Sequence, residues 1–229
     1  MTPPTARFLN GEDLAPLCRD SNVVLVDLST RELYARVHIP GALFLDYDRL
    51  VARHGLTGGL IPPIKELART FSELGIGHDT LVIASDDEGG GKAARLCWTL
   101  DCLGHNRWMV LNGGIHAWLD EKRPLSRAEP RPLRRDFIPR LREQYIADAD
   151  LILEHLGRSG VALLDARSPE EFSGAQRFAR RAGHIPGAMN WEWTDALDAD
   201  RKLRLRPDHE LFAELTARNV VPEREVICY

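Results

Sequence analysis

The chain carries the same pattern twice, and this repeat constrains the fold more than any other feature. Two stretches each begin with an apolar run that ends in an aspartate, Asp27 or Asp165, and each finishes with His-Ile-Pro-Gly-Ala. His38 follows Asp27 by 11 positions and His184 follows Asp165 by 19, so the second stretch holds eight extra residues. A shared pentapeptide within the same order of elements predicts a duplication of one structural unit.

Short apolar runs alternate with helical patterns in both copies. The runs are rich in β-branched residues, are too short for helices and are bounded by turn residues. Residues 65–74 and 92–103 instead repeat apolar side chains at the three- and four-residue spacing of an amphipathic helix. This alternation predicts an α/β fold with two domains, each a mostly parallel sheet flanked by helices. The predicted strands are residues 23–26, 81–83, 109–111, 163–164 and 226–227.

The repeat also predicts the domain boundaries. We expect an N-terminal domain over residues 1–125, a linker rich in arginine and proline over 126–142, and a C-terminal domain over 143–229. After Asp86 the first copy continues through a glycine-rich turn, a helix, a strand and a second helix, whereas the second copy has no such residues after Tyr229. The second domain is therefore incomplete as given, and we expect the sequence to belong to a longer polypeptide.

Composition is typical of a globular protein that stays in solution. Apolar residues make up 44% and charged residues 28% of the chain, and the formal net charge is -4. The N-terminal residues lack the apolar stretch of a signal peptide, and no run approaches the roughly 18 apolar residues of a membrane helix. The basic runs have no interleaved aromatic residues, so we expect no nucleic-acid partner.

The four cysteines follow neither a disulfide nor a metal-binding pattern. There is no Cys-x-x-Cys pair and no metal-type spacing. We therefore expect reduced thiols in a cytoplasmic protein that binds no metal. Cys18, Cys97 and Cys102 are expected to be buried, and Cys228 is expected to pack on a strand.

The loops that follow the central strands are the expected sites of chemistry. In an open parallel sheet, ligands gather at the carboxyl ends of strands, where helix N-termini present N–H groups. In the first copy this loop reads Asp86-Asp87-Glu88-Gly89-Gly90-Gly91-Lys92. Three carboxylates would repel an anion, and the spacing differs from that of a phosphate-binding loop. We interpret the loop as a tight turn that needs positive φ angles, without catalytic chemistry.

Several motifs resemble the rhodanese family. They are HIPGA in both copies, DARSPEEFSG, RAGHIPGAMNWEW and LNGGIHAWLDEKRPLS, which together span nearly the whole chain. The likeness is greatest to bacterial two-domain thiosulfate sulfurtransferases. The resemblance implies that the first copy has lost its cysteine, so Asp86 marks a degenerate site. It also implies a catalytic second copy, whose nucleophilic cysteine is expected immediately after Tyr229.

The resemblance implies a sulfurtransferase that carries sulfur as a cysteine persulfide. Thiosulfate is the expected donor, with mercaptopyruvate as an alternative, and the acceptor is cyanide, a thiol or an acceptor protein. Relatives that use mercaptopyruvate carry an arginine where Glu171 stands, which favours thiosulfate. No cofactor is expected.

Four residues are the candidates for substrate binding. Arg180 and Arg181 lie just before the second His-Ile-Pro-Gly-Ala motif and could offer cations to a dianionic donor. Asp165 ends a strand and either faces the pocket or braces a loop, and Trp191 either lines the pocket or packs in the core. His184 belongs to a motif that the degenerate copy also carries, so a structural hydrogen bond is favoured over catalysis.

Two other classes of function remain open at this point. If both loops lack the cysteine, the protein is a catalytically inactive rhodanese-like binding or regulatory module. A phosphatase or arsenate-reductase relative would also use a cysteine loop, but that loop is one residue longer. The sequence that follows Tyr229 distinguishes these alternatives.

Overall fold

The computed structural model describes residues 7–55 and 57–229, and these divide into two compact units. The first unit extends to Tyr145 and also includes Ala199–Arg204. The second consists of Ile146–Asp198 and Leu205–Tyr229. The division of the sequence into domains at 125 and 142 stays a prediction.

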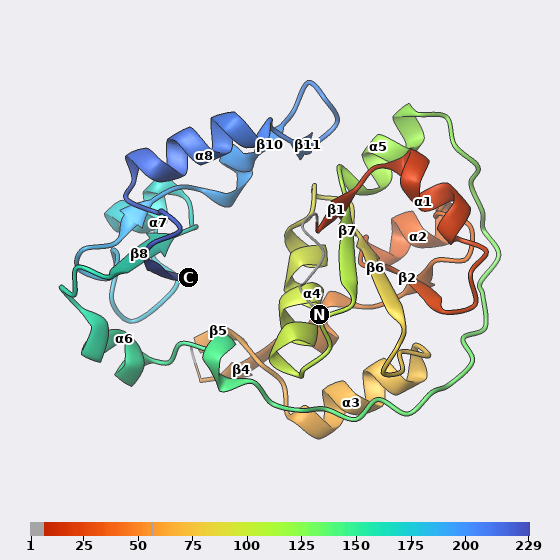
Figure 1. The fold of residues 1–229 in the computed structure, drawn as a ribbon, viewed down its shortest axis with the longest axis horizontal. Coiled ribbons are helices and arrows are strands. Elements are labelled where there is room, and N and C mark those ends of the chain that lie inside the picture. The colour runs from red at the N-terminus through yellow and green to blue at the C-terminus, as the bar shows by residue number, and fades with distance from the viewer. Residues whose placement is uncertain (1–6, 56) are drawn as a thin grey trace. The chain divides into compact units, whose positions relative to one another are not determined.

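The first unit is built on a five-stranded parallel sheet, as the alternating pattern predicts (Figure 1). The strand order is β1-β7-β6-β2-β3, and every neighbouring pair is parallel. Three observed strands exceed the predicted runs by one or two residues, and two short strands, β1 and β3, were not predicted. Their bounds are Phe8–Leu9 (β1), Val23–Asp27 (β2), Leu43–Phe44 (β3), Leu81–Ser85 (β6) and Trp108–Leu111 (β7).

Helices cover both faces of this sheet. Successive side chains of a strand point to opposite sides, and here both sides are apolar, so each face needs a covering layer. On β6, Val82 and Ala84 face one core with α3 and α4, whereas Ile83 faces the other with α1, α2 and α5. Figure 1 shows α4 on one side of these strands and α1 and α2 on the other. The helices are Gly11–Leu17 (α1), Arg31–Arg36 (α2), Ile64–Glu73 (α3), Gly91–Cys102 (α4) and Gly114–Asp120 (α5).

The predicted linker contributes to the first unit. Residues 126–142 form no helix or strand apart from a single bridge at Ser126. Arg135 nevertheless donates hydrogen bonds to Asn22 and Thr80, and the Phe137 ring packs edge-on against Phe71 at 5.1 Å. These contacts hold the segment against the first unit as an ordered strap.

The second unit repeats the central strands of the first on a smaller scale. β8 (Val161–Asp165) lies between β12 (Glu225–Cys228) and β9 (Met189–Asn190), and both pairings are parallel. Its helices are Ala149–His155 (α6), Pro169–Ser173 (α7) and Asp208–Ala217 (α8). The buried apolar cluster consists of Leu163, Ala188 and Ile227, with partly buried side chains packed around it.

Three short features complete the secondary structure. An antiparallel hairpin joins β4 (Ala52–His54) to β5 (Thr57–Leu60), and β10 (Leu197–Asp198) pairs with β11 (Arg204–Leu205). Single 3-10 turns are formed by Tyr47–Leu50 (η1), Glu143–Tyr145 (η2) and Trp193–Ala196 (η3).

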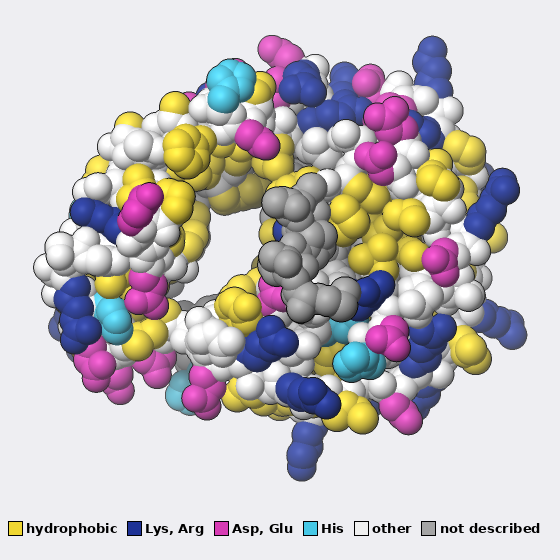
Figure 2. All heavy atoms as spheres, viewed as in Figure 1, with side chains coloured by type: hydrophobic (Ala, Val, Ile, Leu, Met, Phe, Trp, Pro, Cys, Tyr) yellow, Lys and Arg dark blue, Asp and Glu magenta, His cyan; other side chains and the backbone are white. Residues whose placement is uncertain are grey.

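The described surface mixes charges of both signs. On the face shown in Figure 2, lysine and arginine side chains are interspersed with aspartates and glutamates. Among the described residues, no helix is long and apolar enough to cross a membrane.

Candidate active site at the carboxyl ends of the strands

In the first unit, a buried carboxylate occupies the turn between β6 and α4. The Asp86 side chain is fully buried, and its Oδ1 accepts hydrogen bonds from the backbone N–H of Glu88 (3.1 Å) and Gly90 (2.9 Å). Its Oδ2 accepts another from the N–H of Ala93 at 2.9 Å. The φ angles of 93° at Gly89 and 122° at Gly90 are the positive values expected for this turn. The N–H groups that open α4 are thus occupied by the protein's own anion.

The two other acidic residues of this loop are neutralised locally. Lys92 Nζ lies 2.8 Å from Asp87 Oδ1 and 3.3 Å from Glu88 Oε2. Burial raises the pKa of Asp87, but hydrogen bonds from Lys92 and from the Thr30 N–H outweigh it and leave the pKa lowered. The three carboxylates are therefore not open: Asp87 and Glu88 pair with Lys92, and Asp86 fills a cradle of three backbone N–H groups. That this loop lacks catalytic chemistry stays a prediction.

Backbone hydrogen bonds align the strand ends of the two units residue for residue. In the first unit the N–H of Leu28 donates to Ser85 O at 2.8 Å. In the second, the N–H of Ala166 donates to Tyr229 O, also at 2.8 Å. Ser85 and Tyr229 are therefore equivalent, as are Asp27 and Asp165. Asp86 directly follows Ser85, so in this register its expected counterpart is the residue after Tyr229.

Asp165 is fully buried and paired with a cation that the sequence analysis did not single out. Arg167 Nε donates to Asp165 Oδ1 at 2.9 Å and its Nη2 to Oδ2 at 2.6 Å, while the Arg167 N–H also donates to Oδ1. Burial alone raises the pKa of Asp165, but the hydrogen bonds from Arg167 outweigh it and leave the pKa lowered. These contacts are those of a carboxylate that braces a loop, and the role of Asp165 in substrate binding stays a prediction.

Among the described residues, no lysine or arginine pairs with the equivalent carboxylate of the first unit. Asp27 Oδ1 accepts a hydrogen bond from the N–H of Ser29 at 2.8 Å, but Oδ2 has no partner among the described residues. Ser29 stands where the second unit has Arg167. Burial is the main reason that the pKa of Asp27 is raised, and hydrogen bonding from Ser29 offsets it only partly.

Arg167 and Tyr229 connect three segments at the end of the second sheet. Besides Asp165, Arg167 Nη2 donates to Gly183 O at 3.0 Å, and its guanidinium lies 5.4 Å from the centre of the Tyr229 ring. The Tyr229 hydroxyl accepts a hydrogen bond from the N–H of Ile185 at 2.9 Å. The end of β8, the His-Ile-Pro-Gly-Ala loop and the end of β12 are thus held together.

The predicted substrate-binding residues differ in their surroundings. Arg180 and Arg181 lie in the exposed insertion between α7 and His184, and neither guanidinium forms a hydrogen bond or ion pair with another described residue. The Trp191 N–H donates to Asp165 O at 3.0 Å, but its indole Nε1 donates to Glu214 on α8. The structure therefore brings Trp191 and Asp165 together and leaves the two arginines in solvent. Their role in substrate binding stays a prediction.

The two motif histidines have matching structural roles. His38 Nδ1 lies 2.8 Å from Tyr34 O and His184 Nδ1 lies 2.8 Å from Phe172 O. Each imidazole also stacks on the aromatic ring of the same residue, at 4.0 Å and 3.6 Å between centroids. Because the stacked pair recurs in both units, the contacts agree with the structural role favoured for His184.

The cysteines only partly follow their predicted burial. Cys97 and Cys102 are buried as expected, and burial raises the pKa of the Cys102 thiol to about 11. Cys18 is half-buried, and Cys228 is exposed although it was expected to pack on its strand. On β12 only Ile227 is buried, because the side chains on either side of it point away from the core of the second unit.

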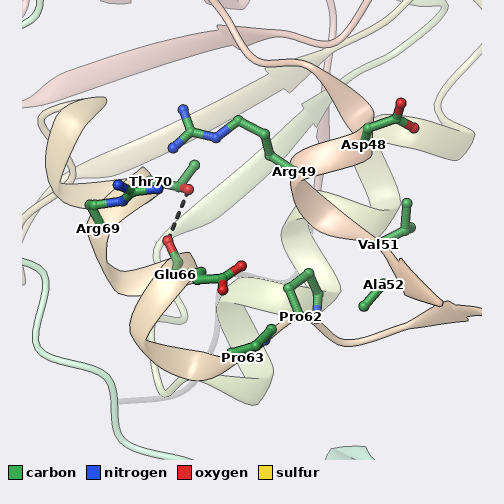
Figure 3. Close-up of a pocket in the computed structure, with 9 residues that line it drawn as sticks. All are labelled: Asp48, Arg49, Val51, Ala52, Pro62, Pro63, Glu66, Arg69 and Thr70. Carbon is green, nitrogen blue, oxygen red and sulfur yellow. Dashed lines mark hydrogen bonds between the residues drawn. The ribbon is translucent and has the colours of Figure 1, made fainter. Parts of the chain in front are cut away.

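A surface pocket lies elsewhere on the first unit (Figure 3). It has a volume of about 280 Å³ and is lined by segments around η1, β4 and the start of α3. Two of its polar side chains already have partners, because Arg49 pairs with Glu73 and Thr70 donates its hydroxyl hydrogen to Glu66 O. We therefore place the candidate active site at the carboxyl ends of the strands.

Comparison with known proteins identifies the family. The model of the rhodanese-like domain matches residues 11–121 and again residues 148–229, so the chain belongs to the rhodanese family. The chain is 41% identical over 217 residues to a thiosulfate sulfurtransferase of Azotobacter vinelandii, and 38% identical over 218 residues to one of Pseudomonas aeruginosa. Each alignment covers 95% of this chain and 79% of the relative.

A solved structure supports the same fold. The 3-mercaptopyruvate sulfotransferase of Escherichia coli superposes with a TM-score of 0.86 at 24% sequence identity. The match covers 98% of this chain and 88% of that chain. The predicted rhodanese fold is therefore confirmed.

Proposed function

We propose that this protein is a thiosulfate sulfurtransferase that carries sulfane sulfur on a cysteine immediately after Tyr229. The observation that carries the proposal is the equivalence of that position to Asp86. In the first unit this position lies in a cradle of three N–H groups at the start of α4. The thiosulfate sulfurtransferases that align with 95% of the chain support the same activity.

The proposed chemistry explains why such a cradle is useful. The cysteine thiolate attacks the outer sulfur of thiosulfate, a new S–S bond forms, and sulfite leaves with the electron pair of the broken bond. Cyanide or a thiolate then attacks the outer sulfur of the persulfide, and the cysteine leaves as a thiolate. Backbone N–H groups at a helix N-terminus stabilise both anionic forms of the cysteine.

The remaining residues of the site are assigned within this proposal. Arg180 and Arg181 attract the dianionic donor to the rim, Asp165 holds the adjoining loops, and Trp191 lies beside it. Glu171 favours thiosulfate over mercaptopyruvate, because it stands where mercaptopyruvate-type relatives carry an arginine. Asp86 marks the non-catalytic site of the first domain.

The organisation and setting are also part of the proposal. Residues 1–125 form the non-catalytic domain and residues 143–229 belong to the catalytic one, with 126–142 between them. We place the protein in the cytoplasm, a setting with which its four free cysteines agree. Its partners are a small sulfur donor and a thiophilic acceptor, without a nucleic acid or membrane.

The intact mass of the purified protein after incubation with thiosulfate tests this function. Cyanide should lower the mass by one sulfur atom and release a stoichiometric amount of thiocyanate. Replacing the cysteine that follows Tyr229 by serine should abolish both changes, whereas Cys228→Ala should leave them intact. If the wild-type mass carries no cyanide-labile sulfur, the protein is a non-catalytic member of the family and the proposal fails.

A further inference from the structure

We propose that Arg167 and Tyr229 form a brace that positions the sulfur-carrying cysteine, with Arg167 as a positioning residue. The inference rests on the proposed function, because it concerns the residue that follows Tyr229. Arg167 lies two residues beyond Asp165, the last residue of β8, and Tyr229 directly follows β12.

The geometry ties the end of β12 to two fixed points. Arg167 spans from the buried Asp165 carboxylate to the carbonyl of Gly183, and its guanidinium lies over the Tyr229 ring. The Tyr229 hydroxyl accepts a hydrogen bond from the Ile185 N–H, and it contributes, after Arg167, to lowering the pKa of Asp165. Both the ring and the backbone of Tyr229 are therefore fixed, since its carbonyl accepts from Ala166. The next residue starts from a restrained position.

The first unit shows that the fold does not need this brace. Its equivalent positions are Ser29 and Ser85, and both hydroxyls lack a hydrogen-bond partner among the described residues, as does Asp27 Oδ2. The strands β2 and β6 still pair in register over five residues. The cation and the phenol are therefore found only in the copy that the proposed function makes catalytic.

Charge gives the brace a second effect. The field of Asp165 contributes to raised pKa values at Cys228, after burial, and at Tyr229, so it reaches the end of β12. The field of Arg167 acts in the opposite direction on Tyr229. Glu171 on α7 is the other carboxylate near the guanidinium, at 3.9 Å. Without Arg167 these carboxylates would leave uncompensated negative charge beside the cysteine and disfavour its thiolate.

The test compares four variants of the full-length protein in a Cys228→Ala background. Arg167→Gln removes the positive charge and the paired hydrogen bonds of the guanidinium to Asp165. Arg167→Lys keeps only the positive charge. Asp165→Asn/Arg167→Gln removes both the negative and the positive charge. Arg206→Gln is the matched control, because Arg206 pairs with two carboxylates of the same unit, Glu210 and Glu214. The readouts are kcat and KM with thiosulfate, the pH dependence of cysteine alkylation, and the thermal midpoint.

We expect Arg167→Gln to lower kcat by about tenfold, since small misplacements of a nucleophile have large effects on rate. Its alkylation profile should move to higher pH and slow alkylation about threefold at pH 7. The double variant should have the same pH dependence of alkylation as the background protein but the low kcat of Arg167→Gln. Arg167→Lys should also keep the pH dependence of the background protein, with an intermediate kcat. Arg206→Gln should change only the thermal midpoint.

Two results would overturn the inference in distinguishable ways. If the background protein transfers sulfur and Arg167→Gln matches Arg206→Gln in kcat and alkylation, Arg167 is merely structural and the brace is wrong. If the Cys228→Ala background protein transfers no sulfur and its cysteines are alkylated no faster than those of the unfolded protein, the proposed function is wrong, and the brace with it.

Discussion

The two units end their central strands with equivalent aspartates but surround them in opposite ways. In the first, Asp27 is buried without a cation, and the nearby N–H cradle is filled by Asp86. In the second, Asp165 is held by Arg167, and the position equivalent to Asp86 follows Tyr229. The same strand pairing therefore supports either a turn whose N–H groups are bonded by its own aspartate or a loop that is held by an arginine–aspartate pair.

This difference shows where the specialisation of a duplicated unit lies. The stacked histidine and the paired strands are shared, so they belong to the fold. The residue two places after the strand aspartate differs between the copies, Ser29 in the first and Arg167 in the second, so we expect this position to serve the function. Substitutions at Asp86, at the two strand aspartates and at Cys228 test this comparison.

The largest expected effect comes from emptying the cradle of the first unit. Asp86→Ala should lower the free energy of unfolding by about 3 kcal/mol, because three N–H groups, one buried and two partly buried, lose their carboxylate acceptor. Asp86→Asn keeps one oxygen acceptor and should lose about half as much. Urea denaturation of the two variants and the wild type measures both values. An unchanged midpoint for Asp86→Ala would show that the turn does not depend on its internal anion.

The next effect contrasts the two strand aspartates. At pH 7, Asp165→Asn should destabilise the second unit by about 2 kcal/mol, because Arg167 loses its ionised partner. Asp27→Asn should instead stabilise the first unit by about 1 kcal/mol, because it removes a buried charge that has no cation. Hydrogen exchange of peptides covering β2 and β8 reports on each unit separately.

The pH dependence of these two effects has opposite signs. The pKa of Asp165 is lowered, so its stabilisation is present above the ordinary carboxyl pKa and is lost as pH falls through the lowered value. The pKa of Asp27 is raised, so its contribution is favourable below the ordinary pKa and is lost as pH rises through the raised value. The gain in Asp27→Asn should therefore disappear in acid. A gain that persists at low pH would contradict this account.

The features that the sequence predicts are those that occur in both copies or that follow the periodicity of a helix or strand. The duplicated aspartate and pentapeptide predicted two equivalent units, and short β-branched runs predicted the central strands. The strand at Phe8–Leu9 was missed because two residues carry no detectable alternation. Side-chain placement was harder, because the insertion that holds Arg180 and Arg181 has no periodicity from which a direction could be inferred.

The pairing of Arg167 needed the structure, although a signal was present. An arginine two residues after a strand aspartate, with serine at the same place in the other copy, marks a difference between duplicates. Its bidentate geometry and its reach to Gly183 depend on the insertion folding back beside β8. The indole of Trp191 likewise bonds Glu214, a partner that only the position of α8 reveals.

The smallest expected effect is at Cys228, where the two copies differ without a contact to explain it. The first copy has Ala84 at this position, paired with β2 in the same register as Cys228 with β8. Because Cys228 is exposed, Cys228→Ala should change the free energy of unfolding by less than about 0.5 kcal/mol. Sulfur transfer should be unchanged, because desolvation of the sulfur by neighbouring protein atoms and, after it, the field of Asp165 raise the pKa of this thiol and disfavour its reactive thiolate. Thiocyanate formation by the variant measures this, and a loss of activity would instead place Cys228 in the transfer of sulfur and make the second copy a two-cysteine site.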